Sequence, residues 1–181
     1  MSILLVGLNH KTAPVSLRER LAFSDEACVE GLRALVDGTF VREGLIVSTC
    51  NRVEVLAEMD GQMAEDERHA RVAQFLSLAR SVPREKFSAH LYTHAEDAAV
   101  RHMFRVASSL DSMVVGEPQI LGQVRHAYSL AVSAGTTGRV LNRLVHHTFP
   151  VSVRTRLATR KVWWTSRLST RPVVPALTAS E

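Results

Sequence analysis

Two apolar runs separated by only three residues constrain the fold of this chain more than any other feature. Residues 44–49 and 53–59 are rich in Leu, Ile and Val, residue types that favour strands. Between them lie Cys50, Asn51 and Arg52. The sequence therefore predicts two successive strands, with Cys50 in the short segment that joins them.

The rest of the first half alternates between strand and helix patterns. Residues 2–9 are rich in Ile, Leu and Val and predict a first strand. Ser24 has the character of an N-cap, and the helix that follows it ends at Gly38. A charged helix is predicted from about residue 64 to 80, and a last short strand at about residues 90–92. The order strand, helix, strand, strand, helix, strand is typical of a ferredoxin-like sandwich. We therefore predict an α+β fold, in which a small mixed or antiparallel sheet is covered by helices.

The second half is predicted to be a helical segment. Residues 93–96 read Thr-His-Ala-Glu, which fits a capping box that opens a helix to about Leu110. Residues 118–134 form the next helical pattern, with a proline in its first position. A final amphipathic helix begins near Val140 and fades near Pro150.

Basic residues are concentrated at the end of the chain. Six of the 22 Lys and Arg residues lie at or after Arg154, but only one of the 18 Asp and Glu residues does. Residues 1–153 are therefore nearly neutral, and the last part of the chain sustains no helical period. We predict a folded domain over residues 1–150 and a divergent basic tail over residues 151–181 that is poorly ordered.

The composition also bears on the compartment. Two cysteines in 181 residues give no disulfide framework. The N-terminus lacks the basic region and cleavage site of a secretory signal, and no stretch approaches the roughly 18 apolar residues that a membrane-spanning helix needs. We expect a cytoplasmic protein in a reducing environment, with no membrane partner.

Cys50 is the strongest candidate for chemistry. A free thiol has a pKa of about 8.5 and becomes more reactive beside a cation. In an extended segment Cys50 and Arg52 point to the same side, so Arg52 could favour the thiolate or hold a substrate carboxylate. The alternative is a small apolar residue at the end of a strand. Cys28 lies on the inner face of its helix and is predicted to be a buried structural thiol.

Other candidates carry less information by themselves. His102 flanks an apolar helical stripe and His10 lies in a loop, and both patterns favour ordinary surface histidines. Gln119 and Gln123 are four residues apart, so their amides share one helix face, which could contact a polar substrate or only solvent. No His, Cys and carboxylate cluster has the spacing of a metal site, and no glycine-rich dinucleotide fingerprint follows a strand.

Taken together, several segments resemble the N-terminal catalytic domain of glutamyl-tRNA reductase. The similar stretches are Gly7-Leu8-Asn9-His10-Lys11-Thr12-Ala13-Pro14-Val15, Arg18-Glu19, Ser48-Thr49-Cys50-Asn51-Arg52, and parts of Val106 to Val124, among them Leu110-Asp111-Ser112, Gly116-Glu117-Pro118-Gln119-Ile120 and Gly122-Gln123-Val124. Four motifs in the same order make the resemblance specific, and it covers about residues 1–150.

The resemblance implies an NADPH-dependent oxidoreductase of tetrapyrrole (porphyrin) biosynthesis. Cys50 would attack the ester that links glutamate to tRNA(Glu), and NADPH would reduce the resulting thioester to glutamate-1-semialdehyde. His102 matches a histidine that is important for activity. The substrate-binding positions that carry over are Thr49, Asn51, Arg52, Ser112, Glu117, Pro118, Gln119 and Gln123. The family also implies homodimers and a downstream aminomutase as a possible partner.

The chain departs from the family pattern after about residue 150. We expect that the Rossmann domain that binds NADPH and the helical dimerisation domain of the family are missing, because of a frameshift or rearrangement near Ser152. Cofactor-binding and metal-binding residues are expected to be absent from this chain. We therefore expect slow glutamyl-tRNA hydrolysis without NADPH oxidation. The alternative is a non-catalytic truncated product, or a fragment that binds tRNA through its basic tail.

Overall fold

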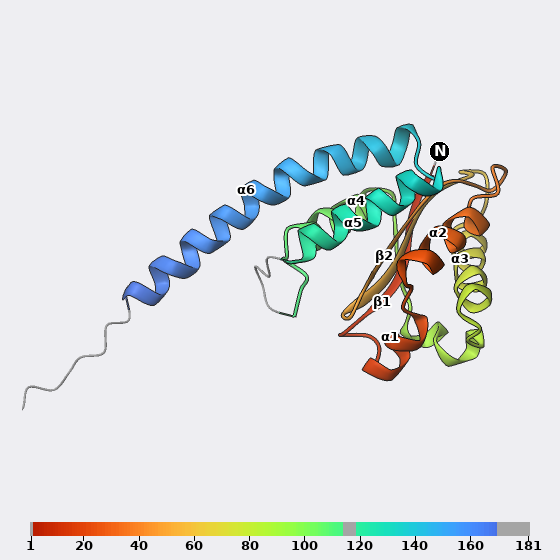
Figure 1. Ribbon diagram of the computed structural model, residues 1–181, viewed down its shortest axis with the longest axis horizontal. Coiled ribbons are helices and arrows are strands. Elements are labelled where there is room, and N and C mark those ends of the chain that lie inside the picture. The colour runs from red at the N-terminus through yellow and green to blue at the C-terminus, as the bar shows by residue number, and fades with distance from the viewer. Residues whose placement is uncertain (1, 114–118, 170–181) are drawn as a thin grey trace, which may run out of the picture.

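A four-stranded antiparallel sheet forms the centre of the fold, shown in Figure 1. The computed structural model describes residues 2–113 and 119–169, with side chains described as far as Thr155. The strands are β1 (Ser2–Asn9), β2 (Val41–Thr49), β3 (Arg52–Met59) and β4 (Tyr92–Ala95). Their order is β2-β3-β1-β4, and each neighbouring pair is antiparallel. This order confirms the predicted ferredoxin-like α+β fold.

One face of the sheet is covered by α2 (Asp25–Leu35) and α3 (Glu65–Arg80), with α1 (Val15–Leu21) at its lower end in Figure 1. The hydroxyl of Ser24 accepts a hydrogen bond from the backbone of Ala27, which confirms the predicted N-cap. Gly44 lies under α2, because a Cβ there would contact Leu35 and Val36 at 3.1 Å. The seven-residue α1 was not predicted.

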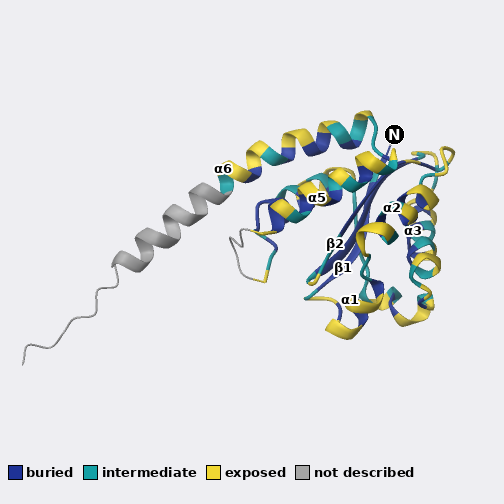
Figure 2. Ribbon diagram, in the orientation of Figure 1, coloured by how far each residue is buried: buried dark blue, intermediate teal, exposed yellow. Residues whose placement is uncertain are grey.

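The opposite face is covered by α4 (Glu96–Ala107), on which α6 (Arg139–Ser169) packs. α5 (Gln119–Ala134) runs along the edge strand β2 and contacts both α2 and α4. Figure 2 shows the strands as a buried layer between these two groups of helices. Alternation along the strands places Leu4 and Val6 toward α2 and α3, and Arg52 and Glu54 toward α4. The α4 side of the sheet therefore receives charged side chains in an otherwise apolar core.

Two predicted boundaries are wrong. The last strand is Tyr92–Ala95, not about 90–92, because Arg84–Lys86 and Ser88–His90 form 3-10 turns. The predicted capping box at residues 93–96 does not form. Thr93 pairs with Val6 in the sheet, so its hydroxyl is unavailable to cap α4 and hydrogen-bonds to Nδ1 of His69 instead.

α6 continues past Pro150, where the sequence pattern predicts that the helix fades. A proline inside a helix removes one backbone hydrogen bond. The buried face nevertheless continues through this turn with Thr148 and Ser152, whose hydroxyls bond to the carbonyl oxygens of Leu144 and Thr148. Residues 151–169, assigned from sequence to a poorly ordered tail, are therefore helical here. Residues 170–181 lie outside the described residues, and the division between domain and tail stays a prediction.

The start of α6 is fixed to the edge of the sheet. The carboxylate of Glu43 in β2 accepts hydrogen bonds from the backbone N–H groups of Val140 and Leu141 at 3.0 and 2.7 Å. Thr136 and Gly44 exchange a further pair of hydrogen bonds, at 2.8 and 3.1 Å. A carboxylate at a helix N-terminus satisfies free N–H groups and interacts favourably with the helix dipole. The direction of α6 is thus set by β2.

The described helices include none that is long and apolar enough to cross a membrane. Within the same residues, no group of three or more His, Cys, Asp or Glu side chains could hold a metal ion.

Candidate active site

Cys50 lies in the two-residue turn between β2 and β3, and it is exposed. The turn is closed by Thr49 and Arg52, which pair across the hairpin. The hydroxyl of Thr49 accepts hydrogen bonds from the backbone N–H groups of Asn51 and Arg52, both at 3.2 Å. A threonine that bonds to the backbone two or three residues ahead is a common way to fix a turn. The predicted placement of Cys50 between two strands is confirmed.

Two neighbouring segments hold this turn from outside. The backbone N–H of His10 donates to the carbonyl oxygen of Asn51 at 2.9 Å. Arg18 in α1 donates from Nε to the carbonyl oxygen of Cys50 at 3.1 Å and from Nη1 to that of Ala13 at 2.6 Å. Arg18 is only 6% exposed. The backbone of Cys50 is therefore fixed, while its side chain is accessible to solvent.

The imidazole ring of His10 is partly buried beside this turn. Its Nδ1 is buried and has no hydrogen-bond partner among the described residues. Burial, and then the charges of Lys11 and Arg52, lower the pKa of His10, so the imidazole is neutral near pH 7.

Arg52 is buried beneath the hairpin and does not share the exposure of Cys50. It is 1% exposed, and Nη1 donates to Oε1 of Glu54 at 2.7 Å. Nη2 donates to the carbonyl oxygen of Asp111 and lies 3.5 Å from Oδ2 of the same residue. The prediction that both side chains point to one side assumed an extended segment, but Cys50 lies in a turn. Arg52 instead links the hairpin to the loop that follows α4.

Glu54 is the centre of the buried network. Its Oε1 also accepts hydrogen bonds from the hydroxyl of Tyr92 and from Nε2 of His102, the latter at 2.7 Å. Burial alone would raise the pKa of Glu54, but the hydrogen bond from His102 and the charge of Arg52 outweigh it. The pKa of this carboxyl group therefore lies below its usual value, and the group is ionised.

His102 is a buried histidine, so the surface position favoured by its spacing in the helix is wrong. Besides its bond to Glu54, its ring stacks on His94 with centroids 4.5 Å apart and lies 5.5 Å from Tyr92. The fold therefore brings His102 and Arg52 together through one shared carboxylate.

Lys11 and Asp111 complete the network at its outer edge. Lys11 Nζ forms an ion pair of 2.5 Å with Asp111 Oδ1, and the Lys11 side chain is 57% exposed. Asp111 also faces Arg52, so the two cations are balanced by the carboxylates of Glu54 and Asp111. Ser112, one of the predicted substrate-binding residues, follows Asp111 directly and is half-buried.

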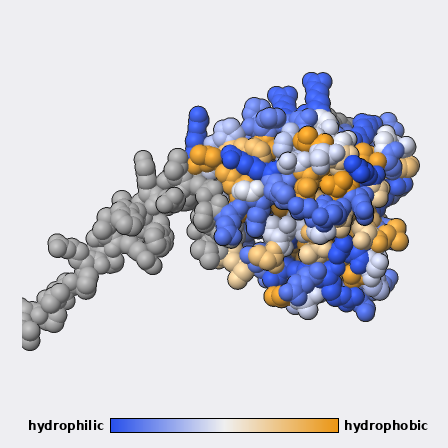
Figure 3. All heavy atoms as spheres, viewed as in Figure 1, coloured by the Kyte–Doolittle hydropathy of each residue, from blue (hydrophilic) through white to orange (hydrophobic). Residues whose placement is uncertain are grey.

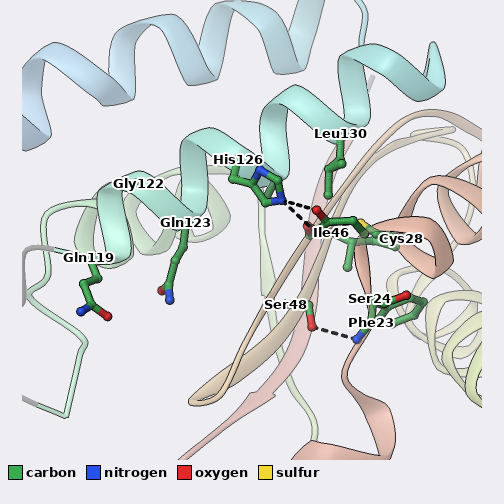
Figure 4. Close-up of a pocket in the computed structure, with 12 residues that line it drawn as sticks. Phe23, Ser24, Cys28, Ile46, Ser48, Gln119, Gly122, Gln123, His126 and Leu130 are labelled. Carbon is green, nitrogen blue, oxygen red and sulfur yellow. Dashed lines mark hydrogen bonds and ion pairs between the residues drawn. The ribbon is translucent and has the colours of Figure 1, made fainter.

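A cavity of about 430 Å³ lies on the other side of the hairpin, between α2, β2 and α5 (Figure 4). Gln119 and Gln123 line it from α5, opposite Ser48 of β2, which directly precedes Thr49. The predicted shared face of the two glutamines is confirmed. Nε2 of His126 bonds to the carboxylate of Asp25 at 2.9 Å and joins the two helices beside the cavity. Two other predicted site residues, Glu117 and Pro118, lie outside the described residues.

Cys28 lies at the inner wall of this cavity and is 3% exposed, as predicted for a structural thiol. Burial, with a smaller contribution from Asp25, raises its pKa to about 11. Cys28 is therefore protonated at neutral pH, and Cys50 is the accessible thiol.

Sequence reasoning did not assign roles to Arg18, Glu54, Tyr92 or Asp111. One signal was present for Glu54, because a glutamate inside the apolar strand Val53-Glu54-Val55-Leu56 needs a buried partner. The partners of Arg18 and Asp111 come from segments 32 and 59 residues away, and no local pattern indicates them.

Comparisons with known proteins point to one family. Residues 6–159 match the family described as "Glutamyl-tRNAGlu reductase, N-terminal domain", and this match runs past Ser152, where a departure was predicted. The glutamyl-tRNA reductases of Pelobacter propionicus and Geobacter sulfurreducens are 50% and 48% identical over 160 and 163 residues. These regions cover 88% of this chain and 36% of each relative, so the chain spans about a third of their length.

A solved structure is also similar. It is the glutamyl-tRNA reductase from Methanopyrus kandleri, with a TM-score of 0.65 and 33% sequence identity. The similarity covers 87% of this chain and 35% of that protein. The fold, the hairpin with its exposed cysteine and these matches together show that the chain belongs to the glutamyl-tRNA reductase family, as a form of its N-terminal domain.

Proposed function

We propose that this domain accepts the glutamyl group of glutamyl-tRNA on Cys50. The thiolate sulfur attacks the ester carbonyl carbon, an S–C bond forms, and the ester C–O bond breaks. The proton lost by the thiol ends on the hydroxyl of the released tRNA, and the glutamyl group stays as a thioester. The observation that carries this proposal is an exposed cysteine at a hairpin turn whose backbone is held by Arg18 and His10.

The remaining predicted residues are assigned supporting roles in this proposal. Thr49 fixes the turn, and Asn51, Ser112, Gln119 and Gln123 supply polar groups for the glutamyl moiety. Two further proposed contacts, Glu117 and Pro118, have no described geometry.

Arg52 needs a separate argument, because its guanidinium is already bound. The contact between Nη2 and Oδ2 of Asp111 is long, at 3.5 Å, so a substrate carboxylate could replace that carboxylate at Arg52. His102 acts through Glu54 and is assigned as a positioning residue for Arg52.

Trapping the thioester tests this function. The purified chain is mixed with tRNA carrying radiolabelled glutamate, quenched in acid and separated by electrophoresis without thiols. We expect a labelled protein band that hydroxylamine removes. The C50S variant should form none, whereas C28S should form as much as the wild type. An unlabelled wild-type protein, or labelling of C50S, would contradict the proposal.

NADPH, which the family implies, does not fit the described residues. The described sheet is antiparallel throughout, whereas dinucleotide phosphates are held where a strand of a parallel sheet leads through a glycine-rich turn into a helix. We therefore assign only the acyl transfer to this domain and expect its thioester to be lost slowly to water. Action on glutamyl-tRNA in the cytoplasm, dimerisation and transfer of product to an aminomutase belong to the same proposal, as properties of the full-length family.

A further inference from the structure

The part of the chain that forms α5 and α6 contains no acidic residue. From Pro118 to Ser180 the sequence has no Asp or Glu, and this interval of 63 residues contains nine Lys and Arg residues. They are Arg125, Arg139, Arg143, Arg154, Arg156, Arg160, Lys161, Arg167 and Arg171. A charge distribution of one sign over so long an interval is typical of a surface that binds a polyanion.

The described part of α6 arranges its arginines on one side. Arg139, Arg143 and Arg154 are all exposed, whereas Leu141 and Val145 are buried against the rest of the domain. At about 100° per residue the three arginines fall within roughly 60° of one another, on the face opposite the buried one. We call these three residues the arginine stripe. It spans about 22 Å along the helix axis.

The arginine stripe is free of local neutralisation. In the part of the chain that the structure describes, no carboxylate forms an ion pair with Arg139, Arg143 or Arg154. In the space-filling view, hydrophilic side chains stand out from the upper edge of the molecule, along which the first half of α6 runs (Figure 3). The stripe therefore presents uncompensated positive charge to solvent.

The stripe is also held in a fixed direction relative to the sheet. The bonds from Glu43 to the first turn of α6, and the pairing of Thr136 with Gly44, attach the helix to β2. The same strand leads directly into the turn that carries Cys50. A rigid connection between a charged helix and a reactive turn suits a large substrate that must contact both.

We propose that the arginine stripe binds the phosphate backbone of the tRNA whose glutamyl group reaches Cys50. This inference rests on the proposed function. Guanidinium groups bind phosphate oxygens with two parallel hydrogen bonds, and their release of counterions makes the affinity depend on salt. The contacts are to the backbone, so they position the RNA and do not read its sequence.

Fluorescence anisotropy with labelled tRNA(Glu) tests the stripe directly. The triple variant R139Q/R143Q/R154Q is compared with R20Q/R33Q/K86Q, which removes three exposed charges from α1, α2 and the turn before β4. At about 0.1 M salt we expect the stripe variant to bind roughly 100-fold more weakly. The slope of log K against log salt should decrease by about three, one for each lost contact. The control should change affinity by less than about threefold at this salt.

Several outcomes would overturn the inference. Equal losses in the two triple variants would mean that net charge, and not the stripe, determines binding. Unchanged tRNA affinity, with the stripe instead needed for binding to anionic phospholipid vesicles or to an acidic protein such as polyglutamate, would assign it to another partner. If the triple variant does not fold by circular dichroism, R143Q alone should still weaken binding about fivefold, and a loss below twofold would count against the proposal.

The same assay separates this inference from the proposed function. C50S should bind tRNA as tightly as the wild type. If the wild-type chain binds tRNA through the stripe but never forms a thioester, only the proposed acyl transfer to Cys50 is contradicted. If the stripe variant forms the thioester with the same rate and KM as the wild type, only the proposed role of the stripe in tRNA binding is contradicted.

Discussion

Arg18 in α1 donates a hydrogen bond from Nε to the carbonyl oxygen of Cys50, although 32 residues separate them in sequence. The second bond of Arg18, to the carbonyl oxygen of Ala13, ties the guanidinium to the loop that precedes α1. No ion pair joins Arg18 to a carboxylate among the described residues, so its charge acts on the turn without a local counter-charge. Arg18 therefore fixes the backbone of Cys50 from outside the turn, while Thr49 fixes it from within.

Replacement of Arg18 should slow acylation of Cys50. A hydrogen bond from a charged donor contributes about 1.5–3 kcal/mol, so R18M should reduce the rate of thioester formation about 10- to 100-fold. R18K keeps the charge but cannot bridge two carbonyl oxygens, and should recover only part of the rate. Single-turnover trapping with labelled glutamyl-tRNA measures this, with R20M as the matched exposed control. A wild-type rate in R18M would show that the turn holds its shape without Arg18.

The two cysteines should differ strongly in reactivity toward iodoacetamide. Burial raises the pKa of Cys28 to about 11, so at pH 8 only about one thiol in a thousand is ionised, and its sulfur is shielded from the reagent. Cys50 is exposed and should be alkylated at least about 100-fold faster. Mass spectrometry of tryptic peptides after short exposures gives both rates. In urea, which unfolds the protein and exposes both thiols, the two rates should become similar. Equal alkylation rates in the native protein would contradict the described burial of Cys28.

The sheet and its hairpin could be predicted from sequence because local patterns specify them. Residues 2–9 and 53–59 are long apolar runs, and the strand order follows from the alternation of strands with helices. His102 could not be placed in the same way. Its helix spacing puts it at the edge of the apolar stripe, and only the carboxylate of Glu54, 48 residues earlier, makes burial favourable.

Tertiary contacts also override local signals at two helix boundaries. Thr93 begins a sequence that is typical of a helix N-cap, but its pairing with Val6 keeps it in β4. A proline at position 150 is expected to end the helix. The hydroxyls of Thr148 and Ser152 nevertheless occupy buried positions on either side of it, and the helix continues. The partner of Thr93 lies in another strand, and Thr148 and Ser152 lie on either side of the proline, so composition and period do not reveal either effect.

Glu54 should stabilise the domain at neutral pH and lose that effect in acid. E54Q removes the nearer of the two carboxylates that face the buried charge of Arg52, so the free energy of unfolding at pH 7 should fall by about 3 kcal/mol. The pKa of Glu54 is lowered in the folded protein, so the unfolded state binds more protons as the pH falls below about 4.3. The stabilisation is therefore present above this pH and disappears as the pH falls through the folded pKa.

Glu58, in the same strand, provides the matched control for Glu54. Burial raises the pKa of Glu58 despite the opposing charge of Arg42, so its ionised form is disfavoured in the folded state. E58Q should leave the free energy of unfolding at pH 7 unchanged or slightly higher. Urea denaturation of the wild type and both variants at pH 7 and pH 3.5 tests these signs. A loss in E58Q as large as that in E54Q would contradict a specific role for the network around Glu54.

Gly138 should be required for the attachment of α6 to β2. A Cβ at this position would lie 2.5 Å from Oε1 of Glu43, the carboxylate that accepts from Val140 and Leu141. G138A must displace that carboxylate, so it should cost about 1–2 kcal/mol of stability, comparable to the loss of a helix cap. G122A in α5 is the control, because a Cβ there meets nothing within 4 Å and alanine favours a helix by roughly 0.5–1 kcal/mol. Opposite signs for the two variants in thermal unfolding are expected, and a stabilised G138A would show that Glu43 does not fix the start of α6.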